Sequence, residues 1–191
     1  MAFKCLPCEK HNRYANLNGY MKKSRKDLIL LITFLVLAVA INAYIIYHAC
    51  LNGMQSSNAS EGVVEASEEV VNTVRPGTVT PENYNAFATF IRKSLGHFGL
   101  FVVSGIFSSL SIYYIFKDFK WIKHFLNTIF ALSFGLIIAM TTEIIQLSVP
   151  ERSGEFTDVL IDYGGYLLGA FLVGLVLLLV IRYQRKKQAN S

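Results

Sequence analysis

Polar and ionisable side chains gather in residues 141–165, where two long apolar runs of the chain meet. The preceding run holds about 18 mostly apolar residues, which as a helix cross about 27 Å, nearly the full hydrocarbon core of a bilayer. Glu143 therefore lies at the lip of a membrane helix, and Gln146 shares its helical face. Asp158 opens the next run, and Asp162 lies about 6 Å deeper on the same face. A carboxylate at such depth is costly unless it faces a polar recess and finds a partner there.

Further ionisable side chains flank these positions. Arg152 lies in the short connection between the two runs, and Lys93 and His97 stand one helical turn apart just before another apolar run. Burial can move a carboxyl group toward neutral pH, so His97 and Glu143 are the candidate catalytic acid and base, with Asp158 orienting the histidine. Basic and amide groups suit an anionic head group. The candidate substrate-binding residues are Lys93, Gln146, Arg152 and Asp162.

A divalent metal held by His97, Glu143 and Asp158 is an alternative use of the same groups. Oxygen and nitrogen ligands that lie far apart in the sequence, without a tight spacing, are weak support for such a site. The sequence therefore predicts no metal site, and it leaves any cofactor unknown.

Four apolar runs dominate the chain, in which 53% of the 191 residues are hydrophobic and 16% are charged. About 20 mostly apolar residues cross a bilayer as a helix. The sequence therefore predicts an all-α, polytopic membrane protein with four transmembrane helices in one small bundle. Two glycines of the last run, Gly165 and Gly169, are expected to pack within this bundle. The predicted spans are residues 28–49, 98–116, 125–145 and 159–181.

Basic residues flank the apolar runs at three places, and they carry the net charge of +5. They precede the first span, separate the second from the third, and follow the fourth. By the positive-inside rule, both termini are cytoplasmic and the polar cluster faces outward. Residues 1–27 and 182–191 are thus predicted to be basic cytoplasmic tails around a membrane domain of residues 28–181. This placement of charge argues against a nucleic-acid-binding surface.

The segment between the first two spans has a polar composition. Residues 52–81 are rich in Ser, Asn, Glu and Gly, so we expect an exposed external loop. Thr80 is the predicted N-cap of a short helix that begins at Pro81, because proline suits the first helical position. This helix is expected to lie on the outer surface and to lead into the second span.

The stretches "IRKSLGHFGLF" and "TTEIIQLSVPERSGEFTDVLIDYGGYLLG" resemble the VanZ-like family of small membrane proteins, named for an accessory factor in teicoplanin resistance. The family pattern has a basic residue before a His-Phe pair, then a Glu and a Gln, an Arg, and an Asp-Val-Leu leading into a glycine-bearing last helix. The resemblance covers about residues 28–181. The family often carries Asn at the position of Asp162. The resemblance implies roles for the matching residues Lys93, His97, Glu143, Gln146, Arg152 and Asp158.

Three functions fit these residues, and the sequence leaves the choice open. The first is an envelope enzyme acting on a lipid-linked or amphiphilic substrate, which the resemblance relates to teicoplanin resistance. The second is a non-catalytic binder, with a polar pocket for the head of an amphiphile and apolar helix faces for its tail. The third is a structural or partner-binding protein whose polar cluster locks the bundle. Membrane lipids are expected partners, the cell membrane is the expected location, and the oligomeric state stays open.

Three cysteines complete the candidate residues. Cys5, Cys8 and His11 lie together in the predicted cytoplasmic tail, where thiols stay reduced. A structural zinc site needs four ligands and no fourth is nearby, so an ordinary tail is preferred to zinc binding or acylation. Cys50 has no evident partner on the outer side, so we predict no structural disulfide.

Overall fold

The computed structural model describes residues 24–117 and 123–189 of the chain. Within these ranges, four runs are long and apolar enough to cross a membrane: Arg25–Ala49, Tyr84–Phe116, Thr128–Leu147 and Phe156–Ala189. The predicted all-α bundle with four spans is therefore confirmed. In chain order the elements are α1 (Arg25–Ala49), α2 (Gly53–Val74), α3 (Tyr84–Ile91), the π-helical segment η2 (Arg92–Gly99), α4 (Leu100–Phe116), α5 (Lys123–Leu147) and α6 (Phe156–Ala189).

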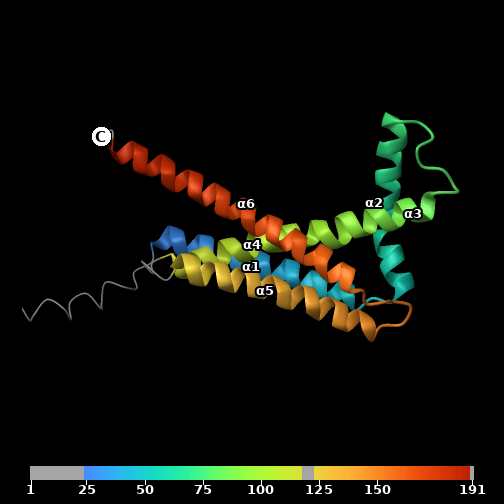
Figure 1. Ribbon diagram of the computed structural model, residues 1–191, viewed down its shortest axis with the longest axis horizontal. Coiled ribbons are helices and arrows are strands. Elements are labelled where there is room, and N and C mark those ends of the chain that lie inside the picture. The colour runs from blue at the N-terminus through green and yellow to red at the C-terminus, as the bar shows by residue number, and fades with distance from the viewer. Residues whose placement is uncertain (1–23, 118–122, 190–191) are drawn as a thin grey trace, which may run out of the picture.

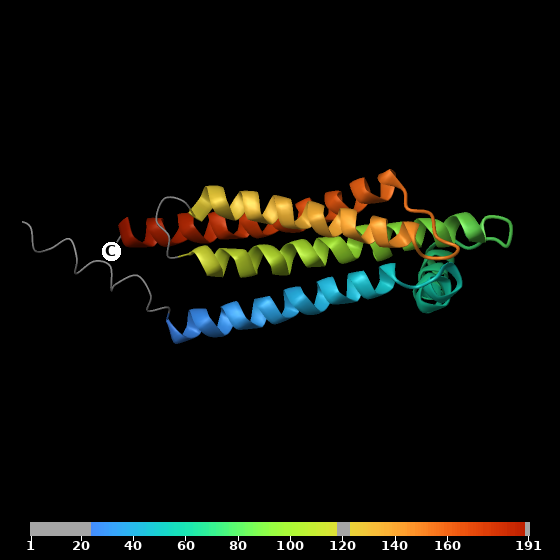
Figure 2. The same cartoon turned by 90° about the horizontal axis from the view of Figure 1, so that it is seen from below.

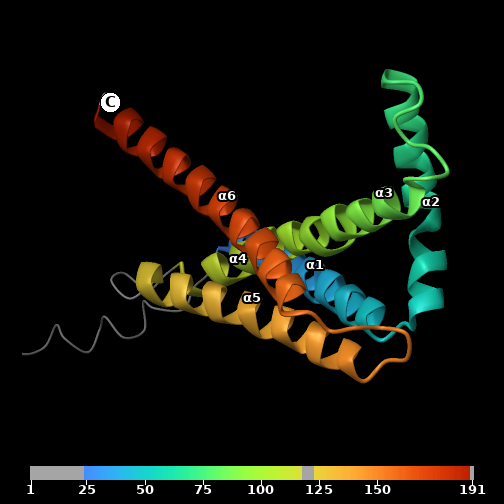
Figure 3. The same cartoon turned by 45° about the vertical axis from the view of Figure 1, so that its right-hand side comes forward.

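The long helices α1, α4, α5 and α6 form the bundle, and α4 contacts each of the other three (Figure 1). The start of α1 and the end of α6 lie at one end of the bundle, whereas α2 and the α5–α6 loop lie at the other (Figure 2). Toward its C-terminus, α6 diverges from the other helices (Figure 3). Phe171 and Val176 on this part of α6 are exposed in the protein, as suits a surface that faces lipid.

The start of α6 packs against η2 and α4 through glycines. A Cβ atom on Gly165 would collide with the backbone carbonyl of Phe98, and one on Gly169 would collide with that of Val102. These two glycines thus pack within the bundle, as expected, and let the helix backbones approach closely. The close approach brings the side chains of η2 and α6 within reach of each other.

The core of the bundle joins all four spans. One part of it is polar, since the buried Asn42 of α1 accepts a hydrogen bond from Ser104 Oγ of α4 at 2.9 Å. The same side chain donates to the Ala38 carbonyl at 2.7 Å, so its buried amide is satisfied at both ends. The buried apolar side chains come from each span and include Ile45, Phe101, Ala139, Val159 and Tyr166.

The prediction that residues 52–81 form a loop is wrong, because most of this segment is the helix α2. The helix begins with a capping box: Asn52 Oδ1 accepts from the Gln55 backbone N–H at 2.8 Å, and Gln55 Oε1 accepts from the Asn52 N–H at 3.2 Å. The sequence did not predict this helix because its composition is polar, as in a loop. Val64 is its buried residue in the described structure. Figure 1 shows α2 crossing the end of the bundle at a steep angle to the long helices.

The short helix expected before the second span is present as α3, but its predicted start is wrong. It begins at Tyr84 rather than Pro81, and its N-cap is Asn83 rather than Thr80. The Asn83 side chain explains the difference, because its Oδ1 accepts the Thr80 backbone N–H at 2.8 Å and closes a turn before the helix. From there, α3 continues through η2 into α4 (Figure 1).

The run from α3 to α4 becomes π-helical over η2. Such segments are rare and frequent at functional sites, because the wider turn changes where side chains point. Lys93 and His97 belong to η2, so they lie on a π-helical turn rather than on the α-helical turn that their spacing predicted. Since η2 contacts α6, this local geometry decides which of its side chains face the start of α6.

Candidate functional site

All the predicted site residues lie at the end of the bundle that carries α2 (Figure 1). The segment η2, the last turns of α5, the α5–α6 loop and the start of α6 supply them. The structure therefore brings together side chains that are up to about 70 positions apart in the sequence. In chain order they are Lys93, His97, Glu143, Gln146, Arg152, Asp158 and Asp162, of which Glu143, Gln146, Asp158 and Asp162 are buried.

His97 and Asp162 form a close pair between η2 and α6. His97 Nδ1 lies 3.1 Å from Asp162 Oδ1, and the side chains are 22% and 1% exposed. The imidazole was predicted to be oriented by Asp158, and this is wrong, because Asp162 is the carboxylate that it contacts. The pair fixes the ring, since a histidine whose Nδ1–H is held by a carboxylate keeps its other nitrogen, Nε2, for a second partner.

Asp158 pairs with Lys93 instead. Lys93 Nζ donates to Asp158 Oδ1 at 2.6 Å and to Glu155 Oε2 at 3.2 Å. The lysine thus bridges a buried carboxylate and an exposed one. Its hydrogen bond and positive charge lower the pKa of the exposed Glu155 carboxyl below its usual range. Lys93 is therefore engaged by the protein's own acids, which weakens its predicted role as a substrate-binding residue.

Glu143 holds the α5–α6 loop with one of its oxygens. Glu143 Oε2 accepts the backbone N–H of Glu155 at 3.0 Å. Its other oxygen, Oε1, is buried and has no hydrogen-bond partner in the part of the chain that the structure describes. Leaving a buried carboxylate oxygen without a partner is costly. The position of Glu143 therefore suits a further ligand.

Arg152, a predicted substrate-binding residue, makes no ion pair among residues 24–117 and 123–189. Its Nη1 donates to Ser56 Oγ of α2 at 2.8 Å, and its Nε is buried without a described partner. Burial lowers the pKa of Arg152, and the negative charges of Glu143 and Asp158 partly offset this. Arg152 thus keeps a buried N–H group for a ligand.

The α5–α6 loop is held against the start of α2. Glu151 Oε2 accepts the backbone N–H of Met54 at 3.3 Å, and the Pro150 carbonyl accepts that of Gly53 at 3.3 Å. A carboxylate at a helix N-terminus is favourable because it meets the unpaired N–H groups there. These contacts place Arg152, the next residue of the loop, beside α2.

Two helices contribute polar side chains that the sequence analysis missed. Arg92 Nε donates to Ser60 Oγ at 3.0 Å, and Ser60 lies one turn after Ser56 on α2. On α1, the rings of Tyr44 and His48 lie one turn apart and contact each other in a tilted arrangement, with centroids separated by 4.5 Å. The two serines were not recognised as a pair because their segment was predicted to be a loop. Its spacing of four residues was the available signal, because two serines so spaced share one face of a helix.

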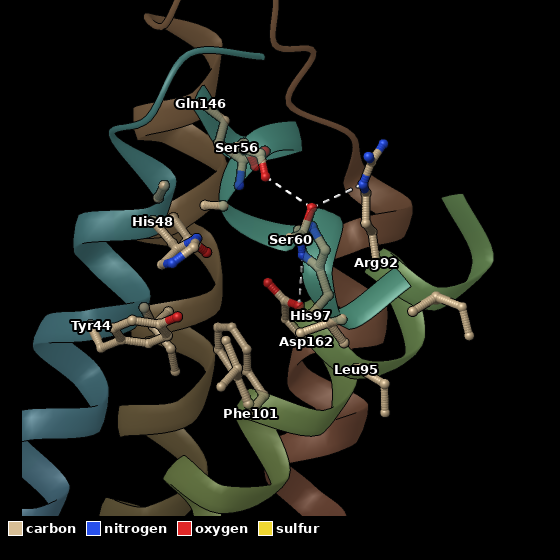
Figure 4. Close-up of a pocket in the computed structure, with 18 of the residues that line it drawn as sticks. Tyr44, His48, Ser56, Ser60, Arg92, Leu95, His97, Phe101, Gln146 and Asp162 are labelled. Atoms are coloured by element: carbon tan, nitrogen blue, oxygen red, sulfur yellow. Dashed lines mark hydrogen bonds and ion pairs between the residues drawn. The ribbon is translucent and has the colours of Figure 1, made fainter. Parts of the chain in front are cut away.

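These side chains enclose a cavity of about 240 Å³ between α1, α2, η2 and the end of α5 (Figure 4). Apolar side chains such as Ile45, Val64 and Phe101 form part of its wall. Figure 4 shows Ser60, Arg92, His97 and Asp162 grouped on one side of it. The polar residues of the lining are Tyr44, His48, Ser56, Ser60, Arg92, His97, Thr142, Gln146, Arg152 and Asp162.

The predicted site therefore divides into two parts that share His97. The cavity is lined by His97, Gln146, Arg152 and Asp162, among other residues. Lys93, Glu143 and Asp158 do not line it. One nitrogen of His97 and one oxygen each of Glu143 and Asp158 lie within 4.8 Å of one another. We call His97, Glu143 and Asp158 the inner cluster.

The sequence matches the VanZ/LLP1 family over residues 22–179, a range that holds every residue of the cavity and of the inner cluster. The chain belongs to the VanZ/LLP1 family. The resemblance noted from the sequence is thus confirmed, and the chain is a VanZ-like membrane protein. A search of curated proteins and a search of solved structures found no match.

The remaining predictions concern the ends of the VanZ-like chain and its cysteines. Cys5, Cys8 and His11 lie outside the described residues, so the interpretation of that tail stays a prediction. The predicted C-terminal tail continues α6 as a helix as far as Ala189. Cys50 follows α1, is exposed and has a free thiol.

Proposed function

We propose that this VanZ-like protein binds the anionic head group of an amphiphile in the cavity. The observation that carries the proposal is the pair of arginines in the lining, Arg92 and Arg152. Within the described chain, the Arg152 Nε is buried and has no partner. A guanidinium group presents N–H donors in a planar fork that matches phosphate and carboxylate. A bound anion would supply the missing acceptor.

The wall of the cavity supports an amphiphile rather than a free anion. Ile45, Val64 and Phe101 give the cavity an apolar side next to its polar one. Ligand sites of this kind bury the apolar part of a ligand and orient it by a few polar groups. The two arginines outnumber Asp162, the carboxylate of the lining, which His97 already contacts. We therefore propose a lipid-linked phosphate as the class of ligand.

We propose further that the cavity opens to the outer leaflet of the cell membrane and that both termini are cytoplasmic. The described ends of the chain lie at the end of the bundle opposite the cavity (Figure 1). The last turns of α6 carry Lys186 and Lys187, and lysines near a span favour the cytoplasmic side. On the cavity side, α2 contains four glutamates and no lysine or arginine.

The His97–Asp162 pair favours a second candidate, in which the cavity also hydrolyses the bound phosphate ester. Water would attack phosphorus and lose a proton, and the bond from phosphorus to the lipid oxygen would break. The alcohol would then leave with a proton, and inorganic phosphate would remain. His97, whose Nδ1 contacts Asp162, would exchange a proton in this step through Nε2 where that nitrogen holds no other ligand. We include a role in teicoplanin resistance in this proposal, and the only support for it is that the chain belongs to the VanZ/LLP1 family.

Two matched probes test the proposal on the purified full-length protein in phosphatidylcholine nanodiscs. One is fluorescent phosphatidic acid, and the other is diacylglycerol with the same acyl chains and fluorophore. We expect saturable binding of phosphatidic acid that is at least about tenfold tighter than binding of diacylglycerol, because only the phosphate can accept charge-assisted hydrogen bonds. Equal affinity for the two probes would overturn the proposal. Release of inorganic phosphate in the same samples would identify the second candidate, and binding without release would favour the first.

A further inference from the structure

We propose that the inner cluster of His97, Glu143 and Asp158 is a binding site for a divalent cation of the zinc type. Its three ligand atoms come from η2, the end of α5 and the start of α6, and they lie within 4.8 Å of one another. Glu143 and Asp158 are 5% and 6% exposed, so the site is largely closed to water. One imidazole with two carboxylates is a ligand set that zinc accepts. Calcium and magnesium instead prefer oxygen ligands throughout.

The spacing of the three atoms is close to what zinc requires. With bonds of about 2.0–2.2 Å, the ligands of a tetrahedral zinc ion lie roughly 3.4 Å apart. The separations in the cluster are within 4.8 Å, so the ligand atoms would have to approach one another by about 1 Å to bind zinc. Three protein ligands leave a fourth position for water or a ligand, as in catalytic rather than structural zinc sites.

The contact between Asp162 and His97 is an independent sign of a metal site. Metal-binding histidines usually donate their second ring N–H to a carboxylate, which fixes the ring and makes the other nitrogen a better ligand. Asp162 Oδ1 lies 3.1 Å from His97 Nδ1, so Nε2 is the nitrogen left for the cation. Asp162 is 1% exposed, so this contact is shielded from water on the carboxylate side. Asp162 is therefore a positioning residue of the proposed site.

A buried oxygen and an excess of negative charge point to the same ligand. Glu143 Oε1 is buried and has no partner within the described ranges. Glu143, Asp158 and Asp162 are three buried carboxyl groups; Lys93 pairs with Asp158 and His97 contacts Asp162, and Glu143 forms no ion pair with any described residue. Buried charges need partners or a metal. A divalent cation would supply both the missing partner and the missing positive charge.

This site departs from the sequence analysis, which predicted no metal. The separation of the ligands along the chain was the reason for that prediction, and the fold removes it by bringing the three helical segments together. The proposal goes beyond the proposed function, since zinc binding can be measured without any amphiphile. The inner cluster borders the cavity through His97, which belongs to both.

The test is zinc binding by the full-length protein, stripped of metal and reconstituted in phosphatidylcholine nanodiscs. Serine replaces Cys5 and Cys8 in every sample, so that these thiols cannot bind the ion. Calorimetric titration with zinc alone is expected to show one site per chain, and magnesium is expected to bind far more weakly. Replacing Asp162 by Asn is expected to weaken zinc binding about 10–100-fold, as is usual when a carboxylate that orients a metal-binding histidine is removed.

Variants of the ligands distinguish a metal site from a structural role. Glu143→Gln and Asp158→Asn are each expected to abolish the site, whereas Glu155→Gln, an exposed acid of the same loop, retains it. Lys93→Met is expected to bind zinc at least as tightly as the parent protein, because Asp158 loses its competing ammonium group. Absence of zinc binding in the parent would overturn the proposal. So would equal affinity in the parent, Glu143→Gln and Asp158→Asn proteins.

Discussion

Replacing both Arg92 and Arg152 by glutamine is expected to abolish measurable binding of fluorescent phosphatidic acid. A hydrogen bond to a charged group contributes about 1.5–3 kcal/mol, so each arginine is worth roughly 10–100-fold in affinity. Arg152 is expected to matter more, because its buried Nε has no partner among the described residues and a bound phosphate would satisfy it. Equilibrium titration of the single and double variants in nanodiscs measures these effects.

An arginine outside the cavity provides the control for this experiment. Arg75 is exposed at the end of α2, so Arg75→Gln removes the same charge without touching the lining. It is expected to leave affinity for phosphatidic acid unchanged. Affinity for the diacylglycerol probe is expected to be the same in all the proteins, since that probe lacks the phosphate. An Arg75→Gln variant that lost as much affinity as Arg152→Gln would show that only the overall charge matters.

Replacing His97 by leucine is expected to destabilise the protein by about 3–5 kcal/mol, the usual loss when one partner of a buried ionic pair is removed. The reason is Asp162, which is 1% exposed and would keep a buried carboxyl group without its contact. The free energy of unfolding can be measured by titrating sodium dodecyl sulfate into mixed micelles. A chelator in the sample keeps any bound metal out of the comparison.

A double-mutant cycle isolates the pair. With His97→Leu already present, Asp162→Leu is expected to recover much of the lost stability, because it removes the orphaned carboxyl group. The same Asp162→Leu change in the parent protein is expected to destabilise it. Additive losses in the two single variants and the double variant would contradict the pairing of His97 with Asp162.

The sequence predicted the four spans and the gathering of the candidate residues near one end of the bundle, because both depend on local signals. Four uninterrupted apolar runs sufficed for the four membrane helices, since a bilayer sets the length that a span needs. Glu143 and Asp162 stood out because carboxylates are rare at such depth. The short connection between α5 and α6 makes them neighbours, and this brings their polar ends together.

The partners within the site could not be predicted, because they depend on helix rotation and not on sequence spacing. His97 and Lys93 lie four residues apart, yet one contacts Asp162 and the other contacts Asp158. The π-helical turn of η2 and the close approach at Gly165 set this assignment. The π-helical turn does not appear in a residue pattern, and the two glycines predicted close packing but not the helix that they contact.

The wall formed by α2 was missed for a different reason. Its polar sequence is typical of a loop, and the helix depends on a capping box and on contacts that the rest of the fold supplies. The serines that meet Arg92 and Arg152 lie on it. An apolar stripe, the usual sign of a helix, is nearly absent from α2, because its one buried residue in the described structure is Val64.

The central claim, that the cavity is reached from the outer leaflet, can be tested on the native cysteines. Cys50 is exposed beside His48 and Ala49, two residues of the cavity lining. In intact cells, a membrane-impermeant maleimide is expected to label a Cys5→Ser, Cys8→Ser protein at Cys50. A Cys50→Ser protein, which keeps Cys5 and Cys8, is expected to be labelled only after the membrane is permeabilised. The reverse pattern, with Cys50 protected until permeabilisation, would contradict the outward-facing cavity.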